Sequence, residues 1–187
     1  MKKNREKEKD SDKGRRRWVV FITIFAFFLS VFMSLFSDIL MKNSTILMAF
    51  IILIGIIVIG IFFDMLGVAV TVADEKPFNS MASSRIKGAK SSLMLIKNAG
   101  RVSNVFNDVI GDTCGIISGS SAAFIVASLS RMGLLNTAVL TVVLSGMVAS
   151  ATIGGKALGK DVAMSRSKEI VTFIGKIIAL FAERRRK

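Results

Sequence analysis

The chain has 187 residues, of which 52% are hydrophobic, and it carries a formal net charge of +13. A soluble domain rarely combines such a high fraction of hydrophobic residues with such an excess of Lys and Arg. Because the chain contains no His and a single Cys, it excludes His-based zinc sites, Ser-His-Asp triads and internal disulfides. We therefore predict an all-α integral membrane protein. The basic residues form patches beside apolar segments, which argues against nucleic-acid binding.

In chain order, hydropathy predicts four transmembrane helices with juxtamembrane amphipathic helices between and after them. The transmembrane helices are predicted at 18–36, 45–73, 102–129 and 134–153. The remaining segments are a basic disordered cytoplasmic tail at 1–17, juxtamembrane helices at 74–101, and an amphipathic helix with a basic tail at 154–187. Trp18 stands at the start of the first apolar run, where it is expected to anchor the helix at the interface.

The distribution of base predicts the orientation of these helices. All of the 26 Lys and Arg residues except Lys42 and Arg131 fall in the tail, the 74–101 loop or the stretch after residue 153. By the positive-inside rule, these three parts are cytoplasmic. We therefore predict a multi-pass protein of the cell (plasma) membrane, with both termini in the cytoplasm and the helices in contact with the lipid bilayer.

Three carboxylates, Asp64, Asp108 and Asp112, fall inside the predicted spans. Each costs about 2.5–3.5 kcal/mol at the centre of a membrane helix, so such residues usually mark a polar interior or a functional site. Counted from the predicted cytoplasmic ends of their helices, Asp64 and Asp112 lie at nearly the same depth. No Lys or Arg is expected inside the bilayer to neutralise them, so we expect a bound cation or protonation to do so.

Further oxygen-bearing side chains accompany these acids. Asn104, Asp108 and Asp112 recur every four residues, which predicts one polar helical face. Asn107 and Thr152 add neutral oxygens. Carboxylate, amide and hydroxyl oxygens suit a hard divalent ion such as Mg²⁺. The predicted cation ligands are therefore Asp64, Asp112, Asp108, Asn107, Asn104 and Thr152. Beside them, Gly111, Gly115 and Gly119 form a small-residue stripe typical of close helix packing.

Three stretches of sequence carry a resemblance to a known family. These are FFDMLGVAV (62–70), GAKSSLMLI (88–96) and VIGDTCGI (109–116). In order and spacing they resemble the FFSGSExAL, GAxxALxLL and LxGNxxVN patterns of the transmembrane domain of the CorC/cyclin-M magnesium transporters. The resemblance runs from about Phe62 to the end of the chain.

This resemblance implies a magnesium site and a homodimer. Asp64 corresponds to the first serine of the SGSE pattern and Asp112 to the asparagine after glycine, two positions associated with the family's cation site. The chain departs from the family where Gly67 and Thr152 replace glutamates. It also has an extra first helix and no CBS modules, so we do not expect regulation by cytosolic nucleotide from this polypeptide alone.

The leading hypothesis is membrane transport or sensing of a divalent cation, most specifically magnesium, through an acidic cytoplasm-facing site. The alternative is a non-transporting membrane scaffold or accessory subunit. An intramembrane aspartyl protease is less favoured, because Val109 stands where a GxGD pattern requires its first glycine. We therefore expect no enzymatic activity.

Overall fold

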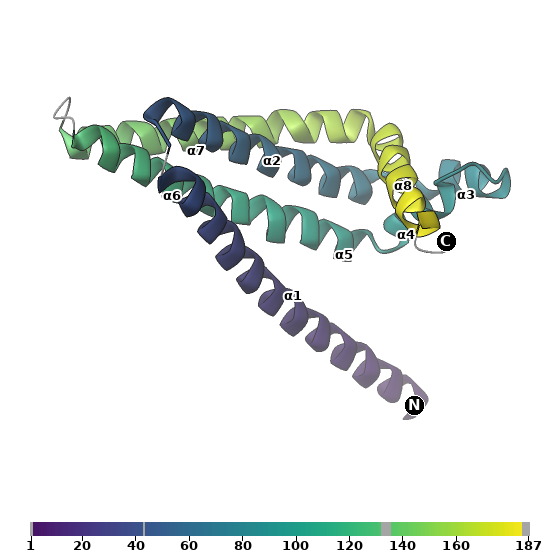
Figure 1. Cartoon of the computed structure of the whole chain (residues 1–187). Helices are drawn as coiled ribbons and strands as arrows, with labels where there is room; N and C mark the ends of the chain where they lie inside the picture. The colour runs from purple at the N-terminus through teal and green to yellow at the C-terminus, as the bar shows by residue number, and fades with distance from the viewer. Residues whose placement is uncertain (1, 43, 132–135, 185–187) are drawn as a thin grey trace.

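The computed structural model describes residues 2–42, 44–131 and 136–184, and within these ranges it contains helices joined by short turns and no strand. Four helices are long and apolar enough to cross a membrane. Three of them form a side-by-side bundle, the fourth diverges from it, and shorter helices lie across one end (Figure 1). The sequence prediction of an all-helical chain with four such helices is confirmed.

The first helix, α1 (Lys2–Lys42), is longer than its apolar run, of which the part long and apolar enough to cross a membrane is Arg16–Lys42. The helix begins within the stretch 1–17, for which the sequence predicts a disordered tail. Lys, Arg and Glu are good helix formers, so the basic stretch continues the helix of the apolar run. The Arg101 guanidinium lies over the ring of Trp18, with Arg101 Cζ 5.2 Å from the centroid of the ring.

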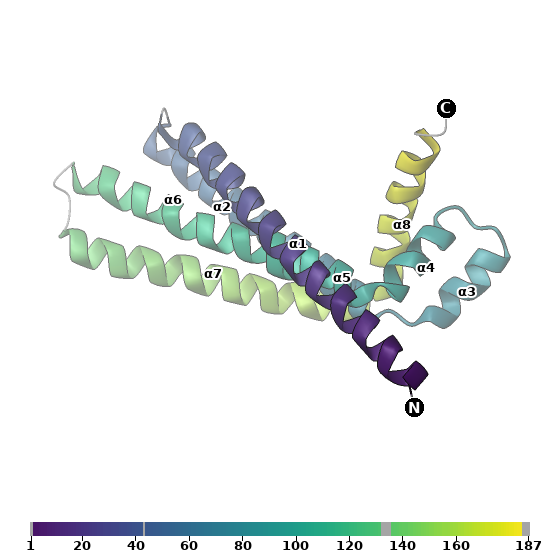
Figure 2. The ribbon, with the colours of Figure 1, turned by 90° about the horizontal axis from the view of Figure 1, so that it is seen from below.

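The packing of α1 is limited to one side of the bundle. It packs mainly against α6 (Asp112–Ser130), and it diverges from the bundle toward its N-terminus (Figures 1 and 2). An apolar cavity of about 250 Å³ lies between α1, α2 and α6. Two hydroxyl pairs join α1 to α6, with Ser30 Oγ 3.1 Å from Thr113 Oγ1 and Ser37 Oγ 3.3 Å from Ser121 Oγ.

The second helix, α2 (Ile46–Val72), is the centre of the bundle and packs against α6, α7 (Thr137–Ser165) and the π-helical segment η1 (Asn104–Gly111). Apart from Asp64 it is apolar on all sides, which is typical of a buried or membrane-spanning helix. Thr45 caps it by accepting a hydrogen bond from the Met48 N–H. Where α2, α6 and α7 pack together, their side chains form one apolar core. It includes Leu53 of α2, Ile125 of α6 and Leu144 of α7.

At one end of the bundle, the short helix α3 (Glu75–Ser83) packs against α4 (Ala89–Lys97), and α4 packs against α8 (Ser167–Arg184). The short helix α5 (Ala99–Ser103) leads from α4 into η1. Figure 2 shows α8 crossing the direction of α6 and α7. A second apolar core, which includes Val70, Phe78, Ile96 and Val171, ties these helices to α2. Helices are therefore present in both segments, 74–101 and 154–187, for which the sequence predicts amphipathic helices.

A close backbone contact fixes α8 against α4. Gly88 has a φ of 88°, which favours glycine. A Cβ atom at Gly175 would lie 2.0 Å from Ser92 Oγ and 2.8 Å from the Gly88 carbonyl oxygen. The buried Ser92 hydroxyl donates to the Val171 carbonyl oxygen over 3.0 Å. The two helices therefore meet through residues that leave no room for a larger side chain.

Candidate functional site

A lysine lies between the two acids that the sequence predicts as cation ligands. Lys156 Nζ is 3.2 Å from Asp112 Oδ1 and 3.7 Å from Asp64 Oδ1. Asp64 comes from α2, Asp112 from the start of α6 and Lys156 from α7. The expectation that no basic residue would neutralise these acids is wrong.

The length of α7 is the reason for this difference. The helix continues without a break to Ser165, twelve residues beyond the end predicted at residue 153. Gly155 and Gly159 hold this extension against α2, because Cβ atoms there would lie 2.1 Å from Ile61 Cδ1 and 3.3 Å from Ile61 Cγ2. Small residues four apart permit such an approach of two helices. Lys156 is thereby placed beside Asp64.

Glycines also bring α2 close to η1 and α6. A Cβ atom at Gly60 would lie 2.9 Å from Cys114 Cβ, and one at Gly111 would lie 3.8 Å from Asp64 Cβ. Of the predicted glycine stripe, only Gly111 is packed in this way, since a Cβ atom at Gly115 or Gly119 would meet nothing within 4 Å in the described part of the chain.

The three charged groups differ in burial. The side chain of Asp64 is 7% exposed, that of Lys156 is 22% exposed and that of Asp112 is 66% exposed. When all three are ionised, they carry one net negative charge. Because a buried charge requires a partner, Asp64 depends on Lys156 more than Asp112 does.

Two buried side-chain oxygens of the predicted ligands have no hydrogen-bond partner among the described residues. They are Asp64 Oδ2 and Asn107 Oδ1. Asn107 packs against Gly67, one helical turn from Asp64 on α2, and its Nδ2 donates to Ser103 Oγ over 3.4 Å. Buried acceptors in proteins are almost always satisfied, so an unsatisfied one is a candidate contact for a bound ion or water.

Among the described residues, the side chains of the other predicted ligands form no hydrogen bond or ion pair with Asp64, Asp112 or Lys156. Asn104 and Asp108 are exposed. The half-buried Thr152 donates its hydroxyl hydrogen to the Val148 carbonyl oxygen within its own helix, over 2.8 Å. Within the described ranges, no group of three or more His, Cys, Asp or Glu side chains is placed to hold a metal ion. A cation at this site would therefore need amide, carbonyl or water oxygens besides Asp64 and Asp112.

The helix carrying Asn104 and Asp108 is not a regular α-helix. Residues Asn104–Gly111 form a π-helix, and at its end the Asp112 N–H donates to the Asn107 carbonyl oxygen, five residues earlier. A spacing of four residues does not define a face in such a segment as it does in an α-helix. Single π-helical turns are rare and frequently occur at functional sites.

Fold and site together define an all-helical protein with four helices of membrane-spanning length and an ion-pair cluster where α2, α6 and α7 meet. In comparisons with family models, curated proteins and solved structures, nothing matches the chain.

Sequence reasoning missed Lys156 because hydropathy ends the fourth apolar run before it. The signal that identifies it is the sequence GGKALG (154–159). Gly155 and Gly159 are four residues apart, which is the spacing of a helix-packing motif, and Lys156 follows the first of them.

Proposed function

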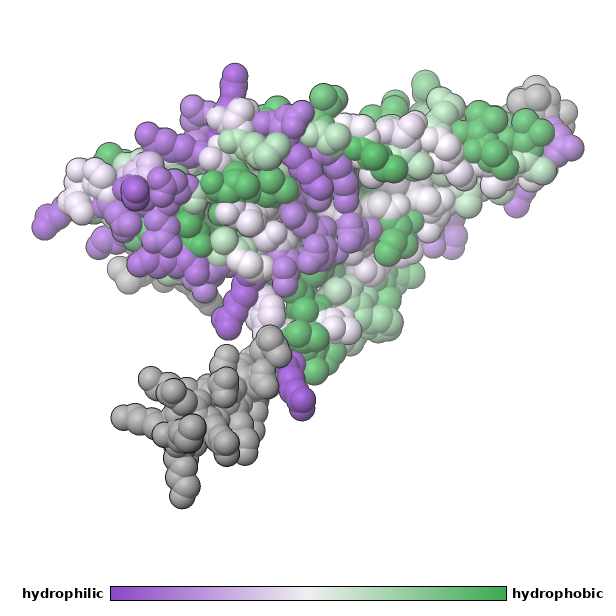
Figure 3. Space-filling model, turned by 180° about the vertical axis from the view of Figure 1, so that it is seen from behind, coloured by the Kyte–Doolittle hydropathy of each residue, from purple (hydrophilic) through white to green (hydrophobic). Residues whose placement is uncertain are grey.

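We propose that the chain is a multi-pass protein of the cell membrane that moves or senses a divalent cation, with magnesium as the first ion to test. Both termini and the end formed by α3, α4 and α8 would face the cytoplasm, as the distribution of base favours. Hydrophilic side chains gather at this end and apolar ones toward the other (Figure 3), which supports the same orientation.

One observation carries the proposal: carboxylates from two different helices converge on a single positive charge, and the second oxygen of the buried carboxylate has no partner among the described residues. The ammonium of Lys156 stands where the cation would bind. The oxygen chemistry of Asp64, Asp112 and Asn107 suits a hard ion. Because Mg²⁺ dehydrates reluctantly, waters would complete its coordination.

In this proposal, the Lys156 ammonium and a divalent cation alternate at the site. A lysine stem is long and flexible enough to carry its ammonium toward water while the stem stays in apolar surroundings. When the ammonium leaves, the two aspartates together carry two negative charges, which match one divalent ion. In this proposal, cation binding and the Lys156 ion pairs are mutually exclusive.

The experiment is magnesium flux into proteoliposomes that carry the purified protein, read by an internal indicator. We expect flux in the unaltered chain and its loss in Asp64→Asn and Asp112→Asn. Asp161→Asn is the matched control, because Asp161 is an exposed aspartate of α7. Equal flux in all of these proteins and in empty vesicles would refute transport.

Sensing predicts a different result in the same preparation. If the chain binds Mg²⁺ without moving it, the ion raises the thermal unfolding midpoint in detergent and Asp64→Asn removes this shift. If the protein shows neither magnesium flux nor a shift of the unfolding midpoint, the cation proposal is wrong.

A second candidate, a non-transporting scaffold or accessory subunit, is favoured by the ion pairs themselves. Lys156 joins α2, α6 and α7 by charge, and such a role needs no ion. The family resemblance of the sequence favours a homodimer in either case. A scaffold predicts that neutralising Asp64 changes the association of the protein and leaves magnesium flux at the level of empty vesicles.

A further inference from the structure

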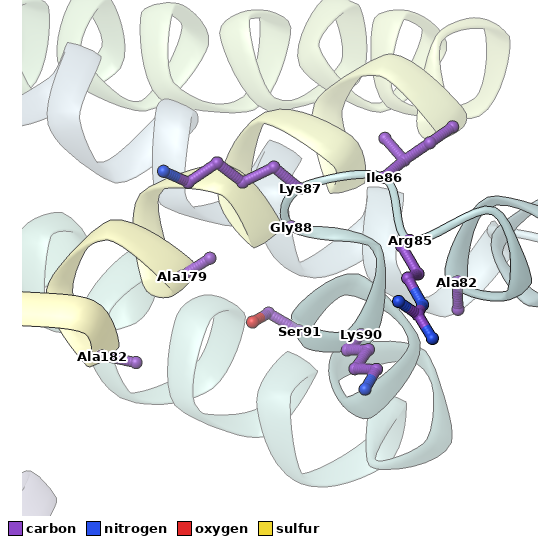
Figure 4. A pocket seen from close by; sticks show the side chains of 9 residues that line it. All are labelled: Ala82, Arg85, Ile86, Lys87, Gly88, Lys90, Ser91, Ala179 and Ala182. Carbon is purple, nitrogen blue, oxygen red and sulfur yellow. The ribbon is translucent and has the colours of Figure 1, made fainter. Parts of the chain in front are cut away.

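A cavity of about 690 Å³ lies among the short helices, away from the ion-pair cluster. It is enclosed by the end of α3, the turn that follows it, the start of α4 and one face of α8 (Figure 4). This volume is within the range of small-molecule binding sites. Three of its nine lining residues, Arg85, Lys87 and Lys90, are basic and none is acidic.

The position of Arg85 in the backbone is unusual. The turn after α3 is a Schellman motif, in which the Ile86 N–H donates to the Met81 carbonyl oxygen and the Arg85 N–H to that of Ala82. Arg85 occupies the left-handed position of this motif with a φ of 55°, where glycine is the usual residue. An observed backbone outlier of this kind is a reason to ask for a function, and the side chain that glycine would lack lines the cavity.

The start of α4 adds to the positive character of the cavity. Lys90 and Ser91 are in the first turn of this nine-residue helix, and no side chain caps it. The N-terminus of a helix carries a partial positive charge and free N–H groups, which favour anions. In Figure 4, Arg85 and Lys90 lie on one side of the cavity, and Ala179 and Ala182 of α8 face it from the other.

Apolar side chains complete the lining of the cavity. Ala179 and Ala182 of α8 and Ile86 of the turn before α4 line it, and Ile86 is 45% exposed. A ligand with an anionic head and an apolar tail fits this combination, because basic and apolar side chains line the same cavity.

We propose that this cavity binds the phosphate of an anionic phospholipid through Arg85, Lys90 and the start of α4, with the acyl chains against Ile86 and the two alanines of α8 that line it. The site is separate from the cation site and does not require cation transport. A free phosphate offers the same head chemistry without the tail, so the experiment compares the two.

The test measures lipid retained by the purified protein in native mass spectrometry after exposure to mixed phosphatidylglycerol and phosphatidylcholine micelles. We expect selective retention of phosphatidylglycerol and a loss of about tenfold or more in Arg85→Gln/Lys90→Gln, from the known attraction of basic residues to anionic lipid. The matched control is Lys76→Gln/Lys97→Gln, which removes the same charge from exposed positions of α3 and α4. Equal losses in both double variants would overturn the proposal, because they would show a general effect of charge.

Arg85→Gly tests the link between the left-handed backbone and the lipid. Glycine adopts a positive φ without the steric cost that arginine has at this position. We therefore expect Arg85→Gly to raise the thermal unfolding midpoint and to lower phosphatidylglycerol retention. Unchanged retention in this variant would count against the site.

Inorganic phosphate, added as a competitor, separates the phospholipid from a free anion. We expect millimolar phosphate to displace the lipid only in part, because it lacks the acyl chains that contact α8. If phosphate displaces the lipid completely, or stabilises the protein as much as the lipid does, the phospholipid assignment is wrong.

Discussion

Lys156 Nζ on α7 lies 3.7 Å from Oδ1 of Asp64 on α2, and the side chain of Asp64 is only 7% exposed. An aspartate at this depth of burial is stable as an ion only beside an opposite charge. Because Asp112 is largely exposed, the Asp64 pair is the part of the cluster on which folding depends. The other oxygen of Asp64 remains without a partner among the described residues, so the lysine satisfies the carboxylate only in part.

Lys156→Met is expected to destabilise the protein, because it leaves the Asp64 carboxylate buried without a counter-charge. Removing one partner of a buried ion pair costs about 3–5 kcal/mol, and the partial exposure of Lys156 places the expected loss nearer to about 2 kcal/mol. The measurement is the free energy of unfolding in detergent micelles. The matched control is Lys160→Met, one turn later on α7 at an exposed position, for which we expect a change within about 0.5 kcal/mol.

The double variant Asp64→Asn/Lys156→Met is expected to recover most of the stability that Lys156→Met loses. It removes both charges together, and replacing a whole buried ion pair by neutral groups is often neutral for stability. The double-mutant cycle isolates the coupling between the two residues. A double variant as unstable as the sum of the two single variants would show that Lys156 stabilises the protein through contacts other than Asp64.

The elements that depend on hydropathy alone were predictable. The run 45–73 predicts the second long apolar helix almost as the structure has it, Ile46–Val72. The run 18–36 identifies the first apolar helix but not the full length of α1. Long apolar runs define membrane-spanning helices because each residue contributes to transfer from water. A helix that continues into polar sequence carries no such signal.

The site was predictable only in its acids. Asp64 and Asp112 were identified from the cost of placing a carboxylate in an apolar segment, and the structure brings both to one lysine. Lys156 was missed because its position follows from the packing of Gly155 and Gly159 on Ile61, a contact between helices that are distant in sequence. The face predicted from the spacing of four residues before Asp112 assumed an α-helix, whereas η1 is a π-helix.

Gly175→Ala is expected to separate α8 from α4. The added methyl group would lie 2.0 Å from Ser92 Oγ, 2.8 Å from the Gly88 carbonyl oxygen and 2.9 Å from the Ser92 nitrogen, and backbone atoms have little freedom to move. Overpacking of this kind costs about 1–3 kcal/mol, which exceeds the gain of about 1 kcal/mol from alanine in a helix. We expect a lower unfolding midpoint and faster proteolysis at the end formed by α3, α4 and α8.

Gly100→Ala is the control for this substitution. Gly100 lies in α5, and a Cβ atom there would meet nothing within 4 Å in the described part of the chain. Alanine should leave stability unchanged or raise it by up to about 1 kcal/mol. If both substitutions lower the unfolding midpoint equally, the close contact of Gly175 with Gly88 and Ser92 is not what fixes α8.

The pairing of Ser37 with Ser121 predicts where α1 joins the bundle. The two hydroxyl oxygens are 3.3 Å apart, and both side chains are buried. In a Cys114→Ala background, Ser37→Cys/Ser121→Cys is therefore expected to form an intramolecular disulfide on mild oxidation, identified by mass spectrometry of the linked peptides. The control pair is Leu35→Cys/Ser121→Cys, because Leu35 is 57% exposed. Absence of the link in the first pair, or equal yields in both, would mean that α1 does not pack on α6 through Ser37.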